Sequence, residues 1–443
     1  MNAVPMGAKL AVYSHTLPPQ SNGQAIVLQR LLESADGEKL LFFGPASLLA
    51  GDLQNGKCLA GDVVLLPDRS ARLRRIPRLG RWLDALLGGT LRFIGNLWRI
   101  RRQLKQRQCD VLVVCTGPWY ELPLCWLAAR LTGIPWIAYV FDWYGRRFDL
   151  LPGIQGRVIG KLARWLEGPL LRRADQVVVP NETLQREYRQ RYGIEAVVIA
   201  NPHGGEDLAK VATEPWPQQP GDVRVRLTGA IYEAHFDAVR NVVEAAAQIE
   251  QPQVTLEAFT EVSEAWLRER AGITGRCIIR QRVPLDEVFS VLETSDVLLL
   301  PLAFDSPFPD IVRTSAPAKF GDYLAAGRPI LVHAPADSFV SEYCRKYQCA
   351  MVVDQNDPAA VLDALRTLIA DHELRATLQR NALARAAADF SVAVSRRRLA
   401  GVLNEVLARP RWAKRNRAAA PSYSDTGQAD STGESARASR EAA

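Results

Sequence analysis

Ionisable and hydroxyl side chains that could hold an anion gather in one short part of the sequence. Lys319 and Asp322 belong to the stretch PAKFGDYLAAGRPIL at residues 317–331, and Thr314 and Ser315 come just before it. The stretch predicts a helix that ends at a glycine and is followed by a buried strand. The free amides at the start of such a helix, beside the Lys319 ammonium and the two hydroxyls, favour binding of an anion, above all phosphate.

Other polar residues follow predicted strands in the first third of the chain. Asn22, Gly23 and Gln24 come after the first strand, and Asp142 ends the strand in GIPWIAYVFDWYG. Loops at the carboxyl ends of parallel strands face the ligand crevice, where Asp142 could orient a hydroxyl or help accept its proton. Two alternatives remain: the Asn-Gly pair forms only a turn, and Asp142 caps a helix or pairs with Arg146.

The elements that would position these residues alternate between strand and helix in two successive sets. This pattern predicts an α/β chain with two doubly wound, Rossmann-like parallel-sheet domains that face a central cleft. We expect an N-terminal domain at 1–205, an acid- and proline-rich linker at 206–222 and a C-terminal domain at 223–391. We expect a helix at 392–409 to pack back toward the first domain, and the tail at 410–443 to be disordered because it has little to bury.

Composition agrees with a folded protein of about two domains. The chain has 443 residues, of which 48% are hydrophobic and 23% charged. No apolar run reaches the roughly 18 residues of a membrane span, and the N-terminus lacks the apolar core of a signal peptide. The seven cysteines are scattered and show no metal-ligand spacing, so we expect reduced thiols in a cytoplasmic protein.

Positive charge is concentrated between Arg69 and Arg107, a segment with many arginines and a single acid, Asp84. Tryptophan and leucine alternate with these arginines. A cationic face beside an aromatic and apolar one suits an anionic membrane surface. The alternative is a set of amphipathic helices that pack on the sheet, with the arginines in solvent. We do not expect nucleic acid as a partner, because no recognised binding motif accompanies the charge.

The order of these features resembles the GT-B glycosyltransferases, specifically the retaining family-4 type, over residues 9 to about 408. The resemblance rests on PAKFGDYLAAGRPIL, VPLDEVFSVLETSDVLLLPL, AVVIANPHG and RLTGAIY in their order and spacing. It implies that the C-terminal domain binds a nucleotide-diphosphate sugar and the N-terminal domain binds the acceptor. It also implies transfer with retention and without a metal or other cofactor, and the sequence contains no DxD motif or clustered acids for a divalent ion.

The resemblance assigns roles to the residues around the predicted anion site. Asp322 corresponds to the ribose-binding acid of the family, which is usually Glu, and the alternative is an acid favoured by the helix dipole. Thr314 stands where the family often has a second Glu, so the hydroxyls of Thr314 and Ser315, or else Asp310, would replace it. Lys319 would face phosphate. Together with Asp142, which is singled out by its place at a strand end, Lys319 and Thr314 are the predicted catalytic residues.

Basic residues for the donor diphosphate are expected at unusual positions. The family commonly has an Arg and a Lys after the first glycine strand of the donor domain, whereas the turn after Gly229 has no basic residue. Arg226, Arg240 and Lys319 are the expected substitutes. Without a metal, cationic side chains and a helix N-terminus must stabilise the leaving diphosphate.

The resemblance places further residues around the donor. Arg282 and Val283, at the end of CIIRQRV, would lie against the base, with a plain strand end as the alternative. The residues from Asn22 to Gln24 would contribute amides from the opposite wall. His203 and His235 could reach the cleft, although a lone histidine more often has a structural role.

The sequence therefore predicts a cytoplasmic, hexosyltransferase-like glycosyltransferase that attaches to the inner face of the cell membrane through its basic segment. It would extend a glycan or lipid-linked acceptor in cell-envelope or exopolysaccharide synthesis. The alternative is a catalytically silent GT-B module that binds a partner glycosyltransferase or a glycan, because the first Glu and the Arg/Lys pair are missing. A sugar-nucleotide epimerase of the same fold is a third option, and it would need further acids and histidines at the cleft.

Overall fold

The structure is a computed structural model, and it describes residues 4–5, 7–53, 59, 61–68, 89–147, 153–205, 208, 211 and 221–409. The predicted tail at 410–443, most of the linker at 206–222 and the first half of the basic segment, at 69–88, lie outside the described residues.

The N-terminal domain is built on a seven-stranded sheet with the order β3-β2-β1-β4-β5-β6-β7. Every pairing is parallel. The strands are β1 (Leu10–Tyr13), β2 (Leu40–Pro45), β3 (Asp62–Leu66), β4 (Val111–Cys115), β5 (Trp136–Tyr139), β6 (Gln176–Val179) and β7 (Val197–Val198). The order reverses between β1 and β4, which is the point where open parallel sheets form a ligand crevice at their carboxyl edge.

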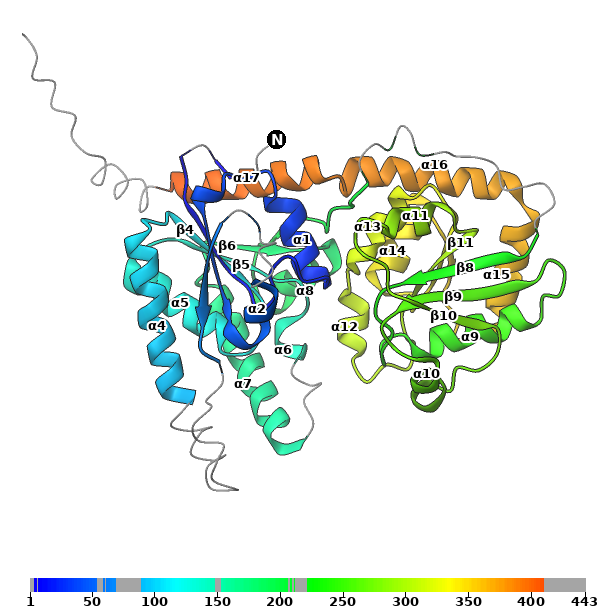
Figure 1. The fold of residues 1–443 in the computed structure, drawn as a ribbon, viewed down its shortest axis with the longest axis horizontal. Coiled ribbons are helices and arrows are strands. Elements are labelled where there is room, and N and C mark those ends of the chain that lie inside the picture. The colour runs from blue at the N-terminus through cyan, green and yellow to red at the C-terminus, as the bar shows by residue number, and fades with distance from the viewer. Residues whose placement is uncertain are drawn as a thin grey trace, which may run out of the picture.

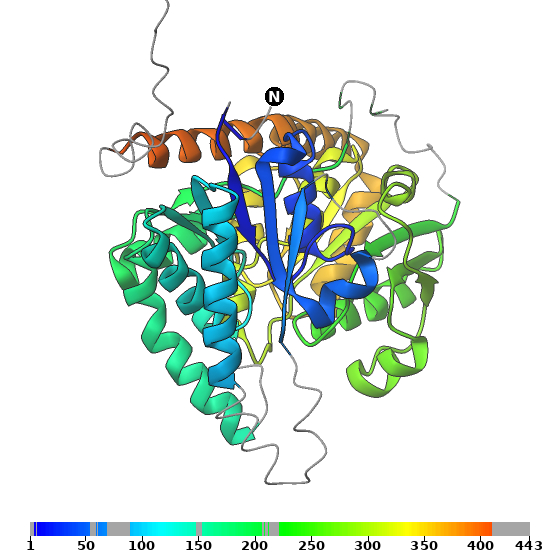
Figure 2. The same ribbon diagram turned by 60° about the vertical axis from the view of Figure 1, so that its left-hand side comes forward.

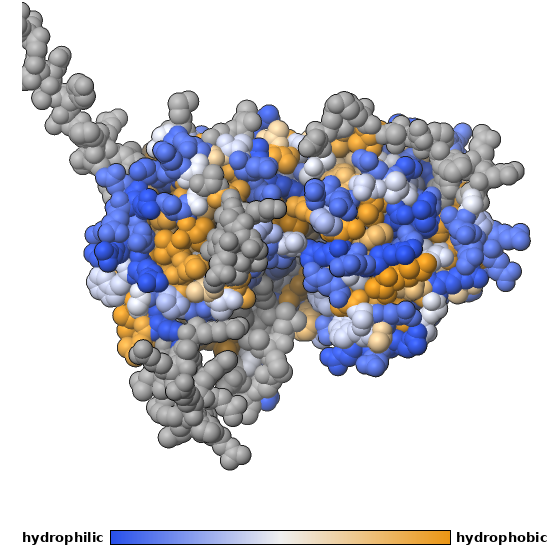
Figure 3. Space-filling view, viewed as in Figure 1, coloured by the Kyte–Doolittle hydropathy of each residue, from blue (hydrophilic) through white to orange (hydrophobic). Residues whose placement is uncertain are grey.

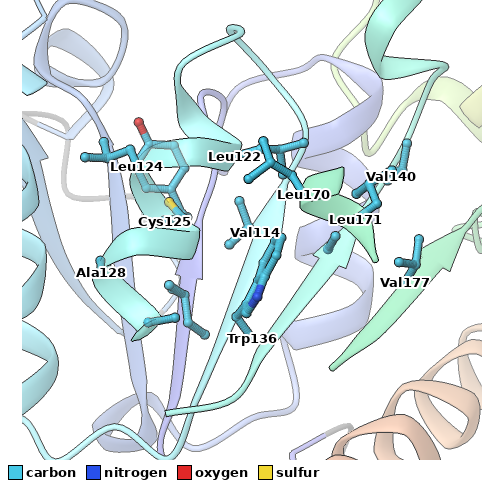
Figure 4. Packing of buried hydrophobic residues seen from close by; sticks show 14 of the residues in the cluster. Val114, Leu122, Leu124, Cys125, Ala128, Trp136, Val140, Leu170, Leu171 and Val177 are labelled. Atoms are coloured by element: carbon cyan, nitrogen blue, oxygen red, sulfur yellow. The ribbon is translucent and has the colours of Figure 1, made fainter. Parts of the chain in front are cut away.

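Helices cover both faces of this sheet. They are α1 (Gly23–Leu32), α2 (Ala46–Leu53), α4 (Gly89–Gln106), α5 (Glu121–Thr132), α6 (Tyr144–Arg147), α7 (Gly153–Leu171) and α8 (Glu182–Tyr192), with a short 3-10 helix at Gly37–Lys39. Helices α4, α5 and α7 share one apolar core with the sheet. Figure 4 shows part of it, in which Leu122 and Cys125 of α5 lie over Val114 of β4 and Trp136 of β5.

The C-terminal domain repeats the arrangement on a six-stranded sheet with the order β10-β9-β8-β11-β12-β13, again with only parallel pairings. The strands are β8 (Val223–Thr228), β9 (Val254–Thr260), β10 (Cys277–Gln281), β11 (Val297–Pro301), β12 (Ile330–His333) and β13 (Met351–Val353). The helices are α9 (Phe236–Ala247), α10 (Glu264–Ala271), α11 (Val288–Glu293), α12 (Pro309–Thr314), α13 (Ala318–Ala325), α14 (Phe339–Tyr347), α15 (Pro358–Ala370) and α16 (His372–Asp389). Two doubly wound parallel sheets confirm the predicted fold class.

The last described helix, α17 (Val392–Ala408), runs from the C-terminal domain across the N-terminal one (Figure 1, Figure 2). Its Leu399, Leu403 and Val406 belong to the apolar core on the α1 face of the N-terminal sheet. The chain thus crosses between the domains twice, before β8 and again at α17. Figure 3 shows the two lobes in contact along the upper part of the molecule and separated below.

Candidate functional site

The predicted anion-binding stretch forms helix α13 followed by strand β12. Phe320, Tyr323 and Leu324 are fully buried and anchor the helix in the core of the C-terminal domain. Gly327 follows the helix with a φ of +62°, a left-handed conformation that favours glycine at a helix end. The predicted helix, its terminating glycine and the following strand are confirmed.

Lys319, in the first turn of α13, places its ammonium at the carboxyl end of the central strand β8. Its Nζ donates to the carbonyl oxygen of Thr228 at 3.1 Å. Burial of the ammonium lowers the pKa of Lys319 to about 7. Among the described residues no carboxylate pairs with it. The next residue after Thr228 is Gly229, whose φ of +95° turns the backbone away from the strand.

His235 lies beside Lys319 and precedes α9. Burial, together with the Lys319 charge, lowers the pKa of His235 to about 3, so its imidazole is neutral at pH 7. The ring packs edge-on against Tyr232, with 4.5 Å between the ring centroids. Lys319 is therefore the positively charged group of this pair and can bind an anion. The adjacent imidazole of His235 is uncharged.

Of the three cations predicted to meet the diphosphate, two are engaged elsewhere. Arg226 is buried. It donates through Nε to the Glu257 carboxylate at 2.8 Å and through Nη1 to the Thr294 hydroxyl oxygen at 2.7 Å. Arg240 donates from Nε and Nη2 to the carbonyl of Ala271, at 3.1 and 2.6 Å. The structure thus gives both guanidiniums structural partners, and Lys319 is the member of this set that sits at the end of β8.

Asp322 is buried and forms an ion pair between the two domains. Its Oδ1 lies 3.0 Å from Nη1 of Arg30 in α1, and its Oδ2 accepts from Nη2 of Arg30 at 3.2 Å. Oδ1 also accepts from the amide of Gly204 at 2.8 Å. Burial raises the pKa of Asp322, while Arg30 and the Gly204 amide oppose that shift. A carboxylate has about four lone-pair directions, so a ribose hydroxyl would share this group with Arg30.

Thr314 and Ser315 lie at the junction between α12 and α13. The Thr314 hydroxyl is buried and donates to the carbonyl of Asp310 at 2.8 Å, and its own carbonyl accepts from the side chain of Asn181 at 2.9 Å. Ser315 is half-buried at the end of α12. The Asp310 carboxylate pairs with Arg146 at 2.8 Å. The acid that could have replaced the missing Glu is therefore committed to an ion pair across the domains.

A cavity of about 640 Å³ opens beside these strand ends and is bounded by both domains. It is lined by Ser21 of the N-terminal domain and by Thr260, Glu261, Val262, Ser263, Ile279, Arg280, Gln281, Arg282, Val283 and Pro284 of the C-terminal domain. Arg282 pairs with Glu261 and donates to the Ser21 carbonyl. Because Thr228 lies opposite Phe259 in the sheet, the cavity and Lys319 occupy adjacent strand ends.

The predicted N-terminal wall is also close to the start of α13. Asn22 caps α1 by accepting from the amide of Ala25 at 3.1 Å. A Cβ on Gly23 would stand 3.2 Å from the Cβ of Ala318, so α1 and α13 meet at their first residues. Gln24 donates to the Ser14 hydroxyl at 2.7 Å.

Asp142 follows β5 and is partly exposed. Arg146, its alternative partner from the sequence, pairs with Asp310 instead. His203 is buried where the chain leaves the N-terminal domain, and burial together with the Arg30 charge lowers its pKa to about 4. Sequence reasoning did not single out Arg30, because nothing in an amphipathic helix shows that one arginine faces another domain.

The described residues contain neither a helix long and apolar enough to cross a membrane nor a group of three His, Cys, Asp or Glu side chains suited to a metal ion. Every cysteine among them is free.

Two family models match the chain. The model of the glycosyl transferase 4-like domain matches residues 51–203, and that of the glycosyl transferases group 1 matches residues 222–371. Together they cover more than half of the sequence, one in each domain. The chain therefore belongs to the group 1 glycosyltransferases and has their GT-B fold, as the sequence predicted. No curated protein sequence matches it.

Solved structures of the same fold include a glycosyltransferase from Rickettsia africae, with a TM-score of 0.62 and 12% identity over 91% of this chain and 100% of that one. Sucrose-phosphate synthase from Thermosynechococcus elongatus gives a TM-score of 0.62 at 13% identity over 90% and 99% of the two chains. HepE from Anabaena in complex with UDP gives a TM-score of 0.60 at 14% identity, over 90% of this chain and 100% of that one. At these identities the likeness shows the fold.

Proposed function

We propose that this glycosyltransferase moves a sugar from a nucleoside-diphosphate sugar to a glycan or lipid-linked acceptor in cell-envelope or exopolysaccharide synthesis. The observation that carries the proposal is the placement of the Lys319 ammonium at the end of β8, next to a cavity bounded by both domains. The cavity can take a nucleoside, and the lysine can meet the phosphate beside it. The UDP and UDP-glucose complexes of HepE support this class of donor.

The proposed reaction proceeds with retention and without a metal ion. Lys319 and the amides at the start of α13 would stabilise the diphosphate as the glycosidic bond breaks, because cations and a helix N-terminus favour developing negative charge. The hydroxyl proton of the acceptor would pass to the departing phosphate. Arg282 and Val283 would contact the base, and Asp322 a ribose hydroxyl.

The alternative, a catalytically silent module, is favoured by one specific observation. The Thr314 hydroxyl is bound to the Asp310 carbonyl, and the Asp310 carboxylate to Arg146, so no carboxylate takes the place of the missing Glu in this corner of the described structure. Such a module would bind a nucleotide or glycan without turnover.

A donor screen followed by product analysis tests the proposal. Thermal shifts are measured with UDP, GDP, ADP and their glucose, galactose and mannose derivatives, since a ligand of the native state raises the melting temperature. The donor that gives the largest thermal shift is then incubated with a lipid extract as the source of acceptor, with and without EDTA. The anomeric configuration of the product is determined by NMR. We expect a shift, EDTA-resistant transfer and a retained anomer. No shift with any donor would overturn the proposal, and a shift without turnover would favour the silent module.

The proposed attachment to a membrane rests on exposed residues of α4 and α7. Leu91, Ile94 and Trp98 of α4 are 69%, 45% and 55% exposed, and Val158 and Trp165 of α7 are 59% and 72% exposed. The N-terminal ends of both helices point to the same lower edge of the molecule (Figure 1, Figure 2). Apolar residues are visible at the start of α4 at the lower left of Figure 3.

The charge of these helices suits anionic lipid. Helix α4 contains no acid, and the acid of α7, Glu167, is buried. The basic residues beside the exposed apolar ones are Arg92, Arg99, Arg101, Arg102, Lys105, Arg157, Lys161 and Arg164. On these two described helices the basic residues lie beside exposed apolar ones, an arrangement that favours the interface of an anionic membrane.

A further inference from the structure

A histidine and a glutamate converge where the strand order of the N-terminal sheet reverses. His15 follows β1, and Glu121 begins α5 after β4; these strands are neighbours, with Tyr13 opposite Val114. A Cβ on Gly117 would collide with both Glu121 Oε2 and His15 Nδ1. Both side chains therefore occupy the space over this glycine, at the crevice that parallel sheets use for ligands.

The two side chains differ in exposure. Glu121 is fully buried, whereas His15 is partly exposed. Tyr13 lies close to the carboxylate: burial, and then the Glu121 charge, raise the pKa of Tyr13. The arrangement thus has a fixed carboxylate in the protein and an imidazole that reaches the surface.

Neighbouring residues limit the movement of this pair. Leu122 and Leu124 are fully buried and fix the first turn of α5 in the core (Figure 4). The Gln24 amide nitrogen is 3.5 Å from His15 Nδ1 while it donates to Ser14. A side chain oriented by its neighbours in this way can bind a ligand group without a large loss of conformational entropy.

The pair lies in the N-terminal domain, beside the start of a loop that leads to the proposed donor site. His15 begins the loop that continues to Ser21, which lines the interdomain cavity, and to Gly23, which meets Ala318 beside Lys319. The imidazole therefore belongs to the N-terminal wall opposite the proposed phosphate site. Trp119 and Tyr120 precede Glu121 with partly exposed rings whose centroids are 6.2 Å apart.

We propose that His15 binds a hydroxyl group of a sugar acceptor and that Glu121 is a positioning residue that orients the imidazole. An imidazole can both donate to and accept from a hydroxyl, and an adjacent carboxylate selects which nitrogen carries the proton. The rings of Trp119 and Tyr120 offer an apolar surface to the C–H face of a sugar. This inference rests on the proposed function and names the acceptor side of the same cleft.

Binding of simple glycosides tests it without knowledge of the natural acceptor. Saturation-transfer NMR is recorded with the methyl glycosides of glucose, galactose and mannose in the presence of UDP. The variants are His15→Gln and Glu121→Gln, which change the hydrogen-bonding groups at nearly constant volume. The matched control is His372→Gln, an exposed histidine in α16. We expect the wild type and the control to bind at least one glycoside, and both site variants to lose most of the signal.

The UDP-induced thermal shift distinguishes a failure of this inference from a failure of the proposed function. We expect it to persist in His15→Gln and Glu121→Gln, because the side chains proposed to contact the donor, Lys319, Arg282 and Asp322, belong to the C-terminal domain. With transfer to a bound glycoside as readout, His15→Gln should raise the acceptor KM by roughly tenfold, which corresponds to ~1.4 kcal/mol for one lost hydrogen bond, and leave the donor KM unchanged. Unaltered glycoside binding in both variants, or none in the wild type, overturns the inference. Absence of a UDP shift in the wild type counts against the proposed function instead.

Discussion

Lys319 couples anion binding to protonation. Replacement of Lys319 by Met should remove the charge from the end of β8 and leave the helix intact. Hydrogen bonds to charged groups contribute about 1.5–3 kcal/mol, so we expect nucleotide affinity to fall by roughly 10- to 100-fold. Isothermal titration with the nucleotide that binds best measures this change. Lys346→Met, at an exposed position of α14, is the control and should bind as the wild type does; an equal loss in both variants would contradict the assignment.

The same residue predicts a pH dependence. The pKa of Lys319 is lowered to about 7 in the folded protein, below its ordinary value of 10.5. Between these two values the unfolded chain binds the extra proton, so the stability of the ligand-free protein should rise with pH from 7 to 10.5. Nucleotide affinity should fall over the same range, because the anion needs the ammonium. Melting curves and titrations across this range check both trends, and Lys319→Met should reduce both slopes.

Individual residues also show where sequence reasoning reached its limit. Lys319 could be placed from sequence, because its position in the first turn of a helix is local information. Arg226 could not, because its partner Glu257 is its direct neighbour in the register of β8 and β9, and a sequence does not show which residues of separate strands align. Likewise, the Arg30–Asp322 pair depends on how the two domains pack.

At the scale of elements, local patterns predicted more. Apolar runs between glycine and proline turns gave the parallel strands, and Gly327 marked the end of α13 because a left-handed residue there favours glycine. Asn181 caps α8, accepting from the amide of Leu184 at 2.8 Å, and asparagine is a common residue at this position. The cavity was harder to foresee, since its lining comes from a loop of one domain and strand ends of the other.

Helices α4 and α7 carry the prediction for membrane binding. Trp98→Ala and Trp165→Ala should each weaken attachment to phosphatidylglycerol vesicles by about tenfold, which corresponds to ~1.4 kcal/mol for partial burial of a large apolar side chain. Cosedimentation at low salt measures the affinity. Ile278→Ala, which removes a residue that is 40% exposed on β10, serves as the control. Equal binding of the wild type to neutral phosphatidylcholine vesicles would contradict the role of the basic residues.

At the scale of the whole molecule, ion pairs of very different burial connect the domains. Arg186 and Glu342 lie 2.6 Å apart with side chains that are 52% and 43% exposed. Arg30 and Asp322 lie 3.0 Å apart with side chains that are only 10% and 9% exposed. An exposed pair contributes about 0–1 kcal/mol, whereas breaking a buried pair leaves an uncompensated charge and costs about 3–5 kcal/mol. The domain arrangement should therefore depend on the buried pair.

Replacement of Arg30 by Met should thus lower the melting temperature well beyond the effect of Arg186→Met, with a cost of about 3 kcal/mol. Burial raises the pKa of Asp322 in the folded protein above 3.8, the value in the unfolded chain. Between 3.8 and the raised pKa the folded protein binds one proton more than the unfolded chain does. Stability therefore falls as pH rises through the pKa of the folded state. Without Arg30 to oppose this shift, the deficit of Arg30→Met should be larger at pH 8 than at pH 5. Adding Asp322→Asn should restore part of the loss. Calorimetry at both pH values measures these effects, and a deficit that matches Arg186→Met or ignores pH would show that this pair does not hold the domains.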